Sequence, residues 1–308
     1  MHASRTSRCR KLHNLIGSVI ILDEAQLLPS EFLSPILRAL KNLVAHFGVT
    51  VVLCTATQPA LATRKKYLTN QTLLDGIEGA REIVGTSLQV AALFQALQRV
   101  EIRGLDQLST IQTWDQIADQ IATHRCALAI VNTRRDALNL HRLLSNLVGI
   151  EKCVHLSALM CAEHRSAVIL DIRRRLAAGE ALVVISTQLV EAGVDLDFPV
   201  VFRALAGLDS IAQAAGRCNR EGKLPEKGMV FIFNPGGKLP GTLGLSINAT
   251  LEVVQSVPLD DPLAPATFER YFNAYYDRAE LDKHGINALL ILIPFQTDHN
   301  FGGQATDI

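Results

Sequence analysis

The sequence lacks several features that would place it in other classes of protein. It has no run of about eighteen apolar residues, the length that a membrane-spanning helix needs, and no apolar signal core at its N-terminus. Its six cysteines form no Cys-x-x-Cys pair, which favours reduced core cysteines over a disulfide framework or a zinc site. We therefore expect a cytoplasmic protein without a structural metal.

The chain also has no excess of charge of either sign. Its 30 Lys and Arg residues balance 30 Asp and Glu residues, which argues against a protein that coats nucleic acid through its net charge. Residues 134–175, however, hold more basic than acidic side chains. Such a locally basic segment suits a nucleic-acid backbone, although an ordinary solvated helix surface explains it equally well.

Two motifs of nucleotide and metal chemistry do not occur in the 308 residues. The phosphate-binding loop G-x-x-x-x-G-K-[ST] is absent, because the Gly-Lys pairs at 222–223 and 237–238 are followed by neither Ser nor Thr. No His-Asp dipeptide is found either. A nucleotide site built from this sequence would therefore have to use other residues.

An acidic pair follows the first of several apolar runs that read as buried parallel strands. Residues 19–22 lead into Asp23 and Glu24, and Gln26 comes two residues later. At the carboxyl edge of such a strand an Asp can hold Mg²⁺ while the adjacent Glu orients and deprotonates a water molecule. For a lone Asp-Glu pair, an acidic helix start is the commoner explanation.

A second cluster combines a glutamine with two arginines. Gln213, Gly216, Arg217 and Arg220 stand at i, i+3, i+4 and i+7, which predicts one face of a helix over residues 210–219 and beyond. Two guanidinium groups on one face suit a nucleoside triphosphate. Taken alone, the octet is explained equally well as a solvated basic face.

Two further apolar runs end in polar residues. Residues 49–54 precede Thr55 and Thr57, and residues 181–186 precede Thr187, with Gly193 and Asp195 beyond it. In chain order, the four clusters resemble motifs II, III, V and VI of superfamily 2 helicases.

The residues around these motifs narrow the resemblance to one family of helicases. Residues 8–26, 52–60 and 202–213 resemble the helicase part of the CRISPR-associated helicase-nuclease of type I interference systems, and the likeness extends over most of residues 8–236. Gln26 stands where the family more usually has a histidine, and in this the chain resembles the subtype I-C branch or a related one.

The resemblance implies an α/β fold of tandem RecA-like parallel-sheet lobes. Residues 1–108 would form the C-terminal half of the first lobe, with a last strand at 100–103, and 109–236 would form a complete second lobe. Residues 237–308 would hold a linker and the start of a C-terminal accessory region. We expect the chain to be a fragment of a larger protein, with the phosphate loop and the nuclease domain outside it.

The resemblance also implies roles for single residues. Asp23 and Glu24 would hold Mg²⁺ with ATP, Glu24 would polarise the attacking water, and Gln26 would couple this site to the second lobe. Thr55 and Thr57 would couple the nucleotide state to DNA, and Asn132, Thr133 and Thr187 would contact the DNA backbone. Gly193 and Asp195 would contact the nucleotide, and Gln213 would bind its terminal phosphate. Arg217 and Arg220 would be arginine fingers.

The implied cofactors are ATP and Mg²⁺, and the implied activity is ATP-driven movement along single-stranded DNA. The implied partners are single-stranded DNA, an RNA-guided CRISPR surveillance complex, and a separate chain carrying the phosphate loop and the nuclease domain if the enzyme is split.

Three interpretations remain open. The first is a fragment of the CRISPR helicase-nuclease, and the second is a fragment of another superfamily 2 DNA or RNA helicase. The third is a non-enzymatic module that binds nucleic acid or partners through its second lobe. Salt-dependent binding of single-stranded DNA without nucleotide would favour the third. Rescue of ATP hydrolysis by a separate phosphate-loop polypeptide would favour a split enzyme.

One aromatic stripe falls outside the helicase motifs. Phe268, Tyr271, Phe272 and Tyr275 lie at helical spacing between residues 267 and 276. Such a stripe is more often core than a base-stacking platform, so we predict that it is buried.

The missing Gly-Lys loop predicts that this chain alone hydrolyses ATP negligibly, because the loop lysine and its backbone N–H groups form the main cradle of a triphosphate. Phosphate release would be measured with and without single-stranded DNA, beside a Glu24→Gln variant. DNA-stimulated release that Glu24→Gln abolishes would contradict the prediction.

Overall fold

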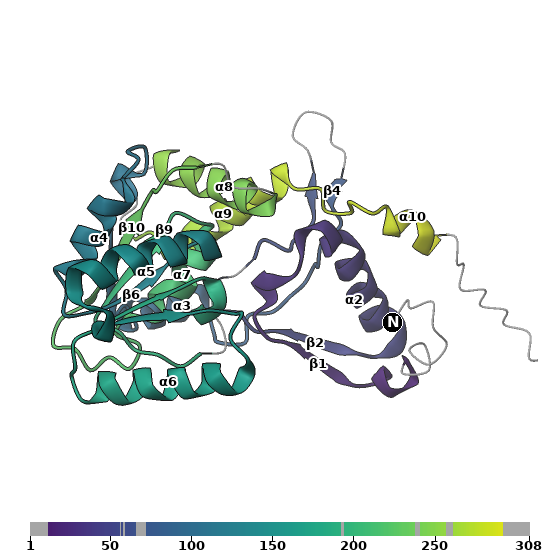
Figure 1. Ribbon diagram of the computed structural model, residues 1–308. Coiled ribbons are helices and arrows are strands. Elements are labelled where there is room, and N and C mark those ends of the chain that lie inside the picture. The colour runs from purple at the N-terminus through teal and green to yellow at the C-terminus, as the bar shows by residue number, and fades with distance from the viewer. Residues whose placement is uncertain are drawn as a thin grey trace, which may run out of the picture.

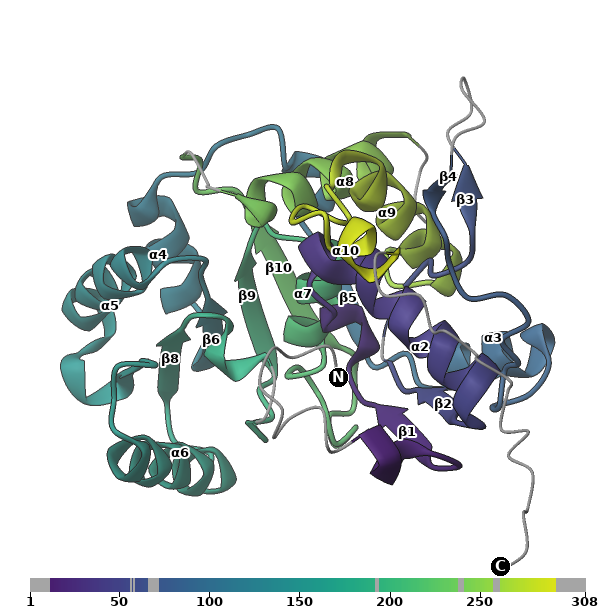
Figure 2. The ribbon, with the colours of Figure 1, turned by 90° about the vertical axis from the view of Figure 1, so that its right-hand side faces the viewer.

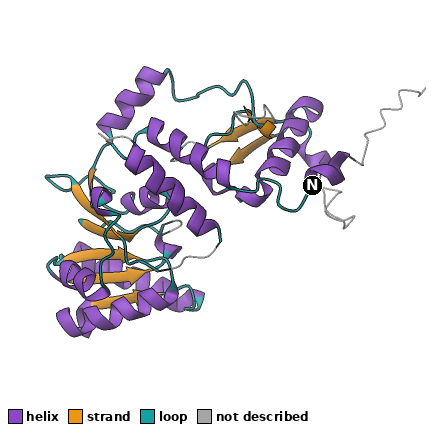
Figure 3. Cartoon of the chain, turned by 90° about the horizontal axis from the view of Figure 1, so that it is seen from above, coloured by secondary structure: helices purple, strands orange, loops and turns teal. Residues whose placement is uncertain are grey.

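The computed structural model describes residues 12–55, 57, 59–65, 72–191, 194–237, 241–256 and 261–291. Two α/β bodies lie side by side, and the helices over residues 242–256 and 265–278 lie against both (Figure 1; Figure 3 from above). The strands are β1 (Val19–Leu22), β2 (Thr50–Leu53), β3 (Arg64–Lys65), β4 (Thr72–Leu74), β5 (Val100–Arg103), β6 (Cys126–Ile130), β7 (Cys153–Leu156), β8 (Leu182–Ser186), β9 (Val200–Ala204) and β10 (Gly228–Phe233). The α-helices are α2 (Leu33–Phe47), α3 (Ser87–Ala96), α4 (Trp114–Ala122), α5 (Arg134–Val148), α6 (Ala162–Ala177), α7 (Leu208–Ala215), α8 (Thr242–Ser256), α9 (Pro265–Arg278) and α10 (Ile286–Ile291).

The larger body is built on a six-stranded parallel sheet with the order β5-β10-β9-β6-β8-β7. Its central strands are continuous apolar runs because both faces of the sheet are covered. Along β6, Leu128 and Ile130 face α6 and α7, whereas Ala127 and Ala129 face α4 and α5. This arrangement confirms the predicted α/β fold with a parallel sheet in the second lobe.

Strand β5 corrects one part of the predicted division of the chain. Residues 100–103 were predicted to form the last strand of the first lobe, but Val100 is the register partner of Gly228 on β10. The sheet of the second lobe therefore begins before residue 108. The sequence gives no sign of this pairing, because β10 comes more than a hundred residues after β5. The other predicted domain limits stay predictions.

The smaller body contains the parallel pair β1-β2 and helix α2. Leu33, Leu37 and Leu40 bury one face of α2, and Gly48, with φ of 64°, ends the helix as predicted. The run that forms β1 was expected to be buried on both faces. Its parallel pairing is confirmed, but Val19 and Ile21 are 62% and 65% exposed, so the expectation of full burial is wrong.

Helix α9 packs between the two bodies. Phe268, Tyr271 and Phe272 are buried in one cluster with Leu33 and Leu37 of α2, which confirms that the aromatic stripe is core.

Two tyrosine hydroxyls of α9 add a polar tie to each body. The Tyr271 hydroxyl donates to Asp209 Oδ1 of α7 at 2.6 Å, and the Tyr275 hydroxyl lies 2.9 Å from Ser30 Oγ, next to α2. The stripe therefore joins the two bodies through both apolar and polar contacts.

Two further expectations concerned the cysteines, predicted to be reduced core residues, and the lack of a membrane-spanning helix. Within the described part of the chain no disulfide forms; Cys153 and Cys218 are buried, but Cys54 and Cys161 are exposed and so are not core residues, as was expected of them. Cys9 lies outside the described residues. None of the described helices is long and apolar enough to cross a membrane.

We predict that Leu37→Ala lowers the free energy of unfolding by about 2–5 kcal/mol, because Leu37 is fully buried in the cluster that joins α2 to α9. Urea unfolding followed by circular dichroism measures the change. Val44→Ala, at a position of the same helix that is 50% exposed, is the control and should change stability by about 0.5 kcal/mol or less. Equal effects of the two substitutions would contradict the described packing.

Cysteine reactivity gives a second prediction. Burial raises the pKa of Cys218 to about 12, so its reactive thiolate is scarce at neutral pH, whereas Cys54 and Cys161 are exposed. Titration of the native protein with a thiol reagent such as DTNB should modify Cys54 and Cys161 rapidly and Cys218 only after unfolding. Rapid labelling of Cys218, identified by peptide mass, would contradict the buried position.

Candidate functional site

The acidic pair lies at the carboxyl end of β1, which points toward the larger body (Figure 1). Glu24 adopts a left-handed backbone, with φ of 53° and ψ of 46°. For a residue with a side chain this conformation costs about 1–2 kcal/mol and persists only where neighbours fix it. Two hydrogen bonds fix it here: Glu24 N donates to Asp23 Oδ1 at 3.0 Å, and Ala25 N donates to Cys54 O at 3.0 Å.

A chain of side-chain contacts connects this turn with the residues after β2. Gln26 is buried, and its Nε2 donates to Glu24 Oε2. The Thr55 hydroxyl contacts Gln26 Oε1 on one side and the carbonyl of Thr57 on the other. The structure thus brings together the residues predicted to sense nucleotide and those predicted to couple its state to DNA.

The glutamine-arginine cluster differs from the predicted helix. Helix α7 ends at Ala215, and Asn219 has a left-handed φ of 46°. Cys218 instead pairs with Phe198 in an isolated parallel bridge, which turns the chain away from the helix axis. Arg217 and Arg220 therefore lie on the turn after the helix, and the predicted continuous face is wrong.

Arg217 is a buried cation with a single anchor. It is 8% exposed, and its Nη2 donates to the backbone carbonyl of Glu191 at 2.7 Å. Its Nε has no hydrogen-bond partner within the described chain. Burial is the main cause that lowers the pKa of Arg217, and Arg220 adds to it, whereas the carboxylates of Asp195, Glu24 and Glu191 oppose the shift. Glu24 belongs to the smaller body, so a charge from that body is among those that oppose the lowering of the Arg217 pKa.

The other predicted nucleotide residues lie on α7, on the turn after it and between β8 and β9. Arg220 Nε lies 3.1 Å from Asp195 Oδ1, and the Asp195 carboxylate is 63% exposed. Gln213, on α7, has a buried Nε2 without a partner among the described residues. Gly193 lies outside the described residues.

The residues predicted to contact DNA stand at the carboxyl ends of β6 and β8. Thr133 caps α5: its Oγ1 accepts from Asp136 N at 3.1 Å. Thr187 is half-buried directly after β8. The amide of Asn132 has internal partners, since its Nδ2 donates to Leu205 O and its Oδ1 accepts from Arg203 Nη1, both at 2.8 Å.

Sequence reasoning assigned no role to a buried ion pair behind this edge. Arg203 Nε lies 2.8 Å from Glu191 Oε1, and the two side chains are 0% and 5% exposed. Ser210 joins them, because its hydroxyl donates to Glu191 Oε2 at 2.6 Å and accepts from Arg203 Nη2 at 3.0 Å. One feature of the sequence does indicate this pair, namely an arginine near the end of the apolar run Val200–Ala204. Arginine is almost never fully buried unless it is paired, so an arginine in a buried strand implies an acidic partner.

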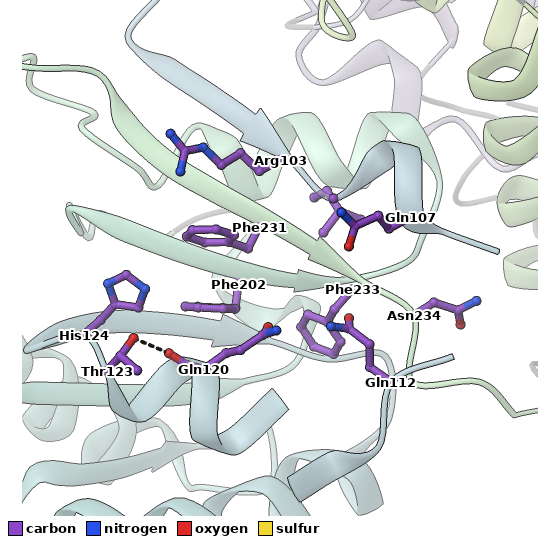
Figure 4. Close-up of a pocket in the computed structure, with 12 residues that line it drawn as sticks. Arg103, Gln107, Gln112, Gln120, Thr123, His124, Phe202, Phe231, Phe233 and Asn234 are labelled. Atoms are coloured by element: carbon purple, nitrogen blue, oxygen red, sulfur yellow. Dashed lines mark hydrogen bonds between the residues drawn. The ribbon is translucent and has the colours of Figure 1, made fainter. Parts of the chain in front are cut away.

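A pocket of about 410 Å³ lies elsewhere, between α4 and strands β5, β9 and β10 (Figure 4). Phe231 stacks on Phe202 with ring centroids 4.9 Å apart, and His124 lies beside both rings. None of the predicted site residues lines this pocket. The pocket is therefore separate from the candidate site at the carboxyl ends of β1, β6 and β8, which is called the strand-edge site below.

Comparison with known proteins gives a consistent result. The family model described as "CRISPR-associated nuclease/helicase Cas3, C-terminal" matches residues 123–223. The CRISPR-associated nuclease/helicase Cas3 of Haloferax volcanii is 56% identical over 54 residues, which is 17% of this chain and 6% of that protein. The protein of the same name from Methanothermobacter thermautotrophicus is 27% identical over 205 residues, covering 65% of this chain and 24% of that protein.

The fold has solved counterparts. The crystal structure of T. fusca Cas3-ATP matches with a TM-score of 0.60 at 18% identity, covering 89% of this chain and 37% of that one. At this identity the likeness shows the fold, and it agrees with RecA-like α/β lobes. The chain spans about a quarter or less of the length of the two curated relatives.

Proposed function

We propose that this chain, which is similar to the C-terminal part of the CRISPR-associated nuclease/helicase Cas3 over residues 123–223, forms part of an ATP-dependent motor on single-stranded DNA in CRISPR defence. The observation that carries the proposal is the buried Arg217 guanidinium, which has one hydrogen bond, to the Glu191 carbonyl, and whose Nε has no partner within the described chain. A buried guanidinium with an unused donor suits the negative charge of a phosphoryl group, and the Glu24 carboxylate of the smaller body is among the charges that act on its pKa.

The residues present fit ATP and Mg²⁺. Arg217 Nε and Gln213 Nε2 are buried donors without partners in the described chain, and phosphate oxygens would accept their hydrogen bonds. Asp23 and Glu24 supply carboxylate oxygens, the ligands that Mg²⁺ prefers. Bound ATP would supply the phosphoanhydride bond whose hydrolysis drives the motor.

In this proposal each side chain has one task. Glu24 orients and deprotonates the attacking water, and its side chain is held by the hydrogen bond from Gln26 Nε2. Gln26, Thr55 and Thr57 transmit the state of Glu24 to the edge of β2. Arg217 and Arg220 stabilise negative charge on the transferred phosphoryl group, with Asp195 holding Arg220 until nucleotide arrives.

The DNA path is proposed along the carboxyl edge of the larger sheet, where Thr133 and Thr187 lie. Exposed Arg134 and Arg135 follow Thr133 directly and would add charge for a phosphate backbone. An RNA-guided surveillance complex is the proposed partner that delivers the strand. The subtype I-C assignment stays a prediction.

A binding-only module is the second candidate, because the sequence contains no Gly-Lys phosphate loop. Under this alternative, the basic edge binds single-stranded DNA with the same affinity whether or not nucleotide is present. Fluorescence anisotropy of a labelled oligo-dT at two salt concentrations, with and without ATP, distinguishes the two.

The proposal predicts that Arg217→Ala weakens binding of the fluorescent nucleotide mant-ATP with Mg²⁺ about tenfold, because loss of a charged hydrogen bond costs about 1.5–3 kcal/mol before compensation by water. Fluorescence titration to high protein concentration measures the dissociation constant. Arg174→Ala is the control, since that guanidinium pairs with Asp171 and Glu180 on exposed α6. The same affinity in both variants would contradict the assigned role.

A further inference from the structure

Three neighbouring strands of the larger sheet end at one buried guanidinium. Arg203 is the penultimate residue of β9, Asn132 comes soon after β6, and Glu191 follows the short helix η6 (Gln188–Val190) after β8. In the sheet these strands are adjacent, in the order β9-β6-β8. Arg203 contacts Asn132 Oδ1, its neighbour's carbonyl at Ala204, and the carboxylate of Glu191, all at 2.8 Å. One side chain therefore fixes the relative positions of three strand ends.

A buried ion pair of this kind stabilises a core less than the attraction between its charges suggests. Desolvation of two buried charges offsets much of their attraction, and apolar residues of similar volume often stabilise a protein as well or better. Burial raises the pKa of Glu191, while Arg203 and Ser210 oppose that shift. In some proteins such pairs serve to fix one conformation, and here the contacts of Arg203 join the ends of three strands.

That geometry reaches Arg217 through one backbone atom. The carbonyl of Glu191, whose side chain Arg203 holds, accepts the hydrogen bond from Arg217 Nη2 at 2.7 Å. Among the described residues, the Arg217 guanidinium makes this one hydrogen bond. Its Nε has no partner there. Movement of Glu191 would therefore release Arg217.

We infer that Arg203 and Glu191 are positioning residues, which hold the Arg217 guanidinium in place without touching nucleotide themselves. Asn132 belongs to the same group of contacts, because Arg203 and Leu205 bind both ends of its amide. Asn132 therefore positions Arg203, and Thr133 and Thr187 are left to contact DNA. The inference rests on the proposed function for what Arg217 does, but the positioning itself is a property of this chain.

The test follows the Arg217 guanidinium directly. The full chain is labelled with ¹³C,¹⁵N-arginine, and the Nε–Hε signal of Arg217 is assigned by its loss in Arg217→Lys. In the wild type this buried group should give a resolved, slowly exchanging signal. Glu191→Gln, which keeps the carbonyl and removes the charge, and Arg203→Lys, which keeps the charge and removes the fork, should each abolish the signal or speed its exchange at least about tenfold.

Two further variants separate positioning from stability. Tyr271→Phe removes another buried hydrogen bond of α7, to Asp209, and should lower the melting temperature while leaving the Arg217 signal in place. The double variant Glu191→Met with Arg203→Met removes both charges, so it should recover stability relative to the single variants but not the Arg217 signal.

An Arg217 signal unchanged in Glu191→Gln and Arg203→Lys would overturn the inference and leave the pair as a structural contact. A wild type without a protected Arg217 signal would overturn it as well. Titration with mant-ATP forms a separate arm: failure of the wild type to bind would contradict the proposed function, and the arginine signal would still decide whether the pair positions Arg217.

Discussion

The buried pair between Arg203 and Glu191 is the contact on which the strand-edge site depends. A guanidinium with no exposed surface must keep its partners, because an unpaired buried charge is strongly destabilising. The ends of β6, β8 and β9 are therefore held in one arrangement. Arg217 inherits that arrangement through the Glu191 carbonyl. Apolar packing alone would hold the sheet together but would not specify where this arginine points.

The second constraint is the contact between the two bodies. The aromatic residues of α9 bury one side against α2, and the Tyr271 and Tyr275 hydroxyls bond to opposite bodies. Ser30, the partner of Tyr275, lies six residues after Glu24, so this contact also limits where the acidic turn sits. Seen from the side, α2 and α9 lie close together above β1 (Figure 2). These contacts, rather than any direct bond between Glu24 and Arg217, hold the two bodies together.

Much of this organisation could be predicted from the sequence, because strands buried on both faces are apolar runs and polar motifs begin where such runs end. The parallel sheet, most of its helices and the buried aromatic stripe were predicted correctly. The placement of β5 was not, because its partner is distant in sequence. The end of α7 at Ala215 was missed because helical spacing continues into a turn that a tertiary bridge fixes. Arg203 was overlooked because burial of a charge depends on partners from three other segments.

The central claim is that Glu24 and Arg217 belong to one nucleotide site across the two bodies. A double-mutant cycle with Glu24→Gln, Arg217→Ala and their combination, read as mant-ATP affinity in the presence of Mg²⁺, tests it most directly. The account predicts a coupling free energy above about 0.5 kcal/mol, because residues that share a ligand are not independent. Additive effects within about 0.3 kcal/mol would contradict it, since distant, unconnected residues behave in that way.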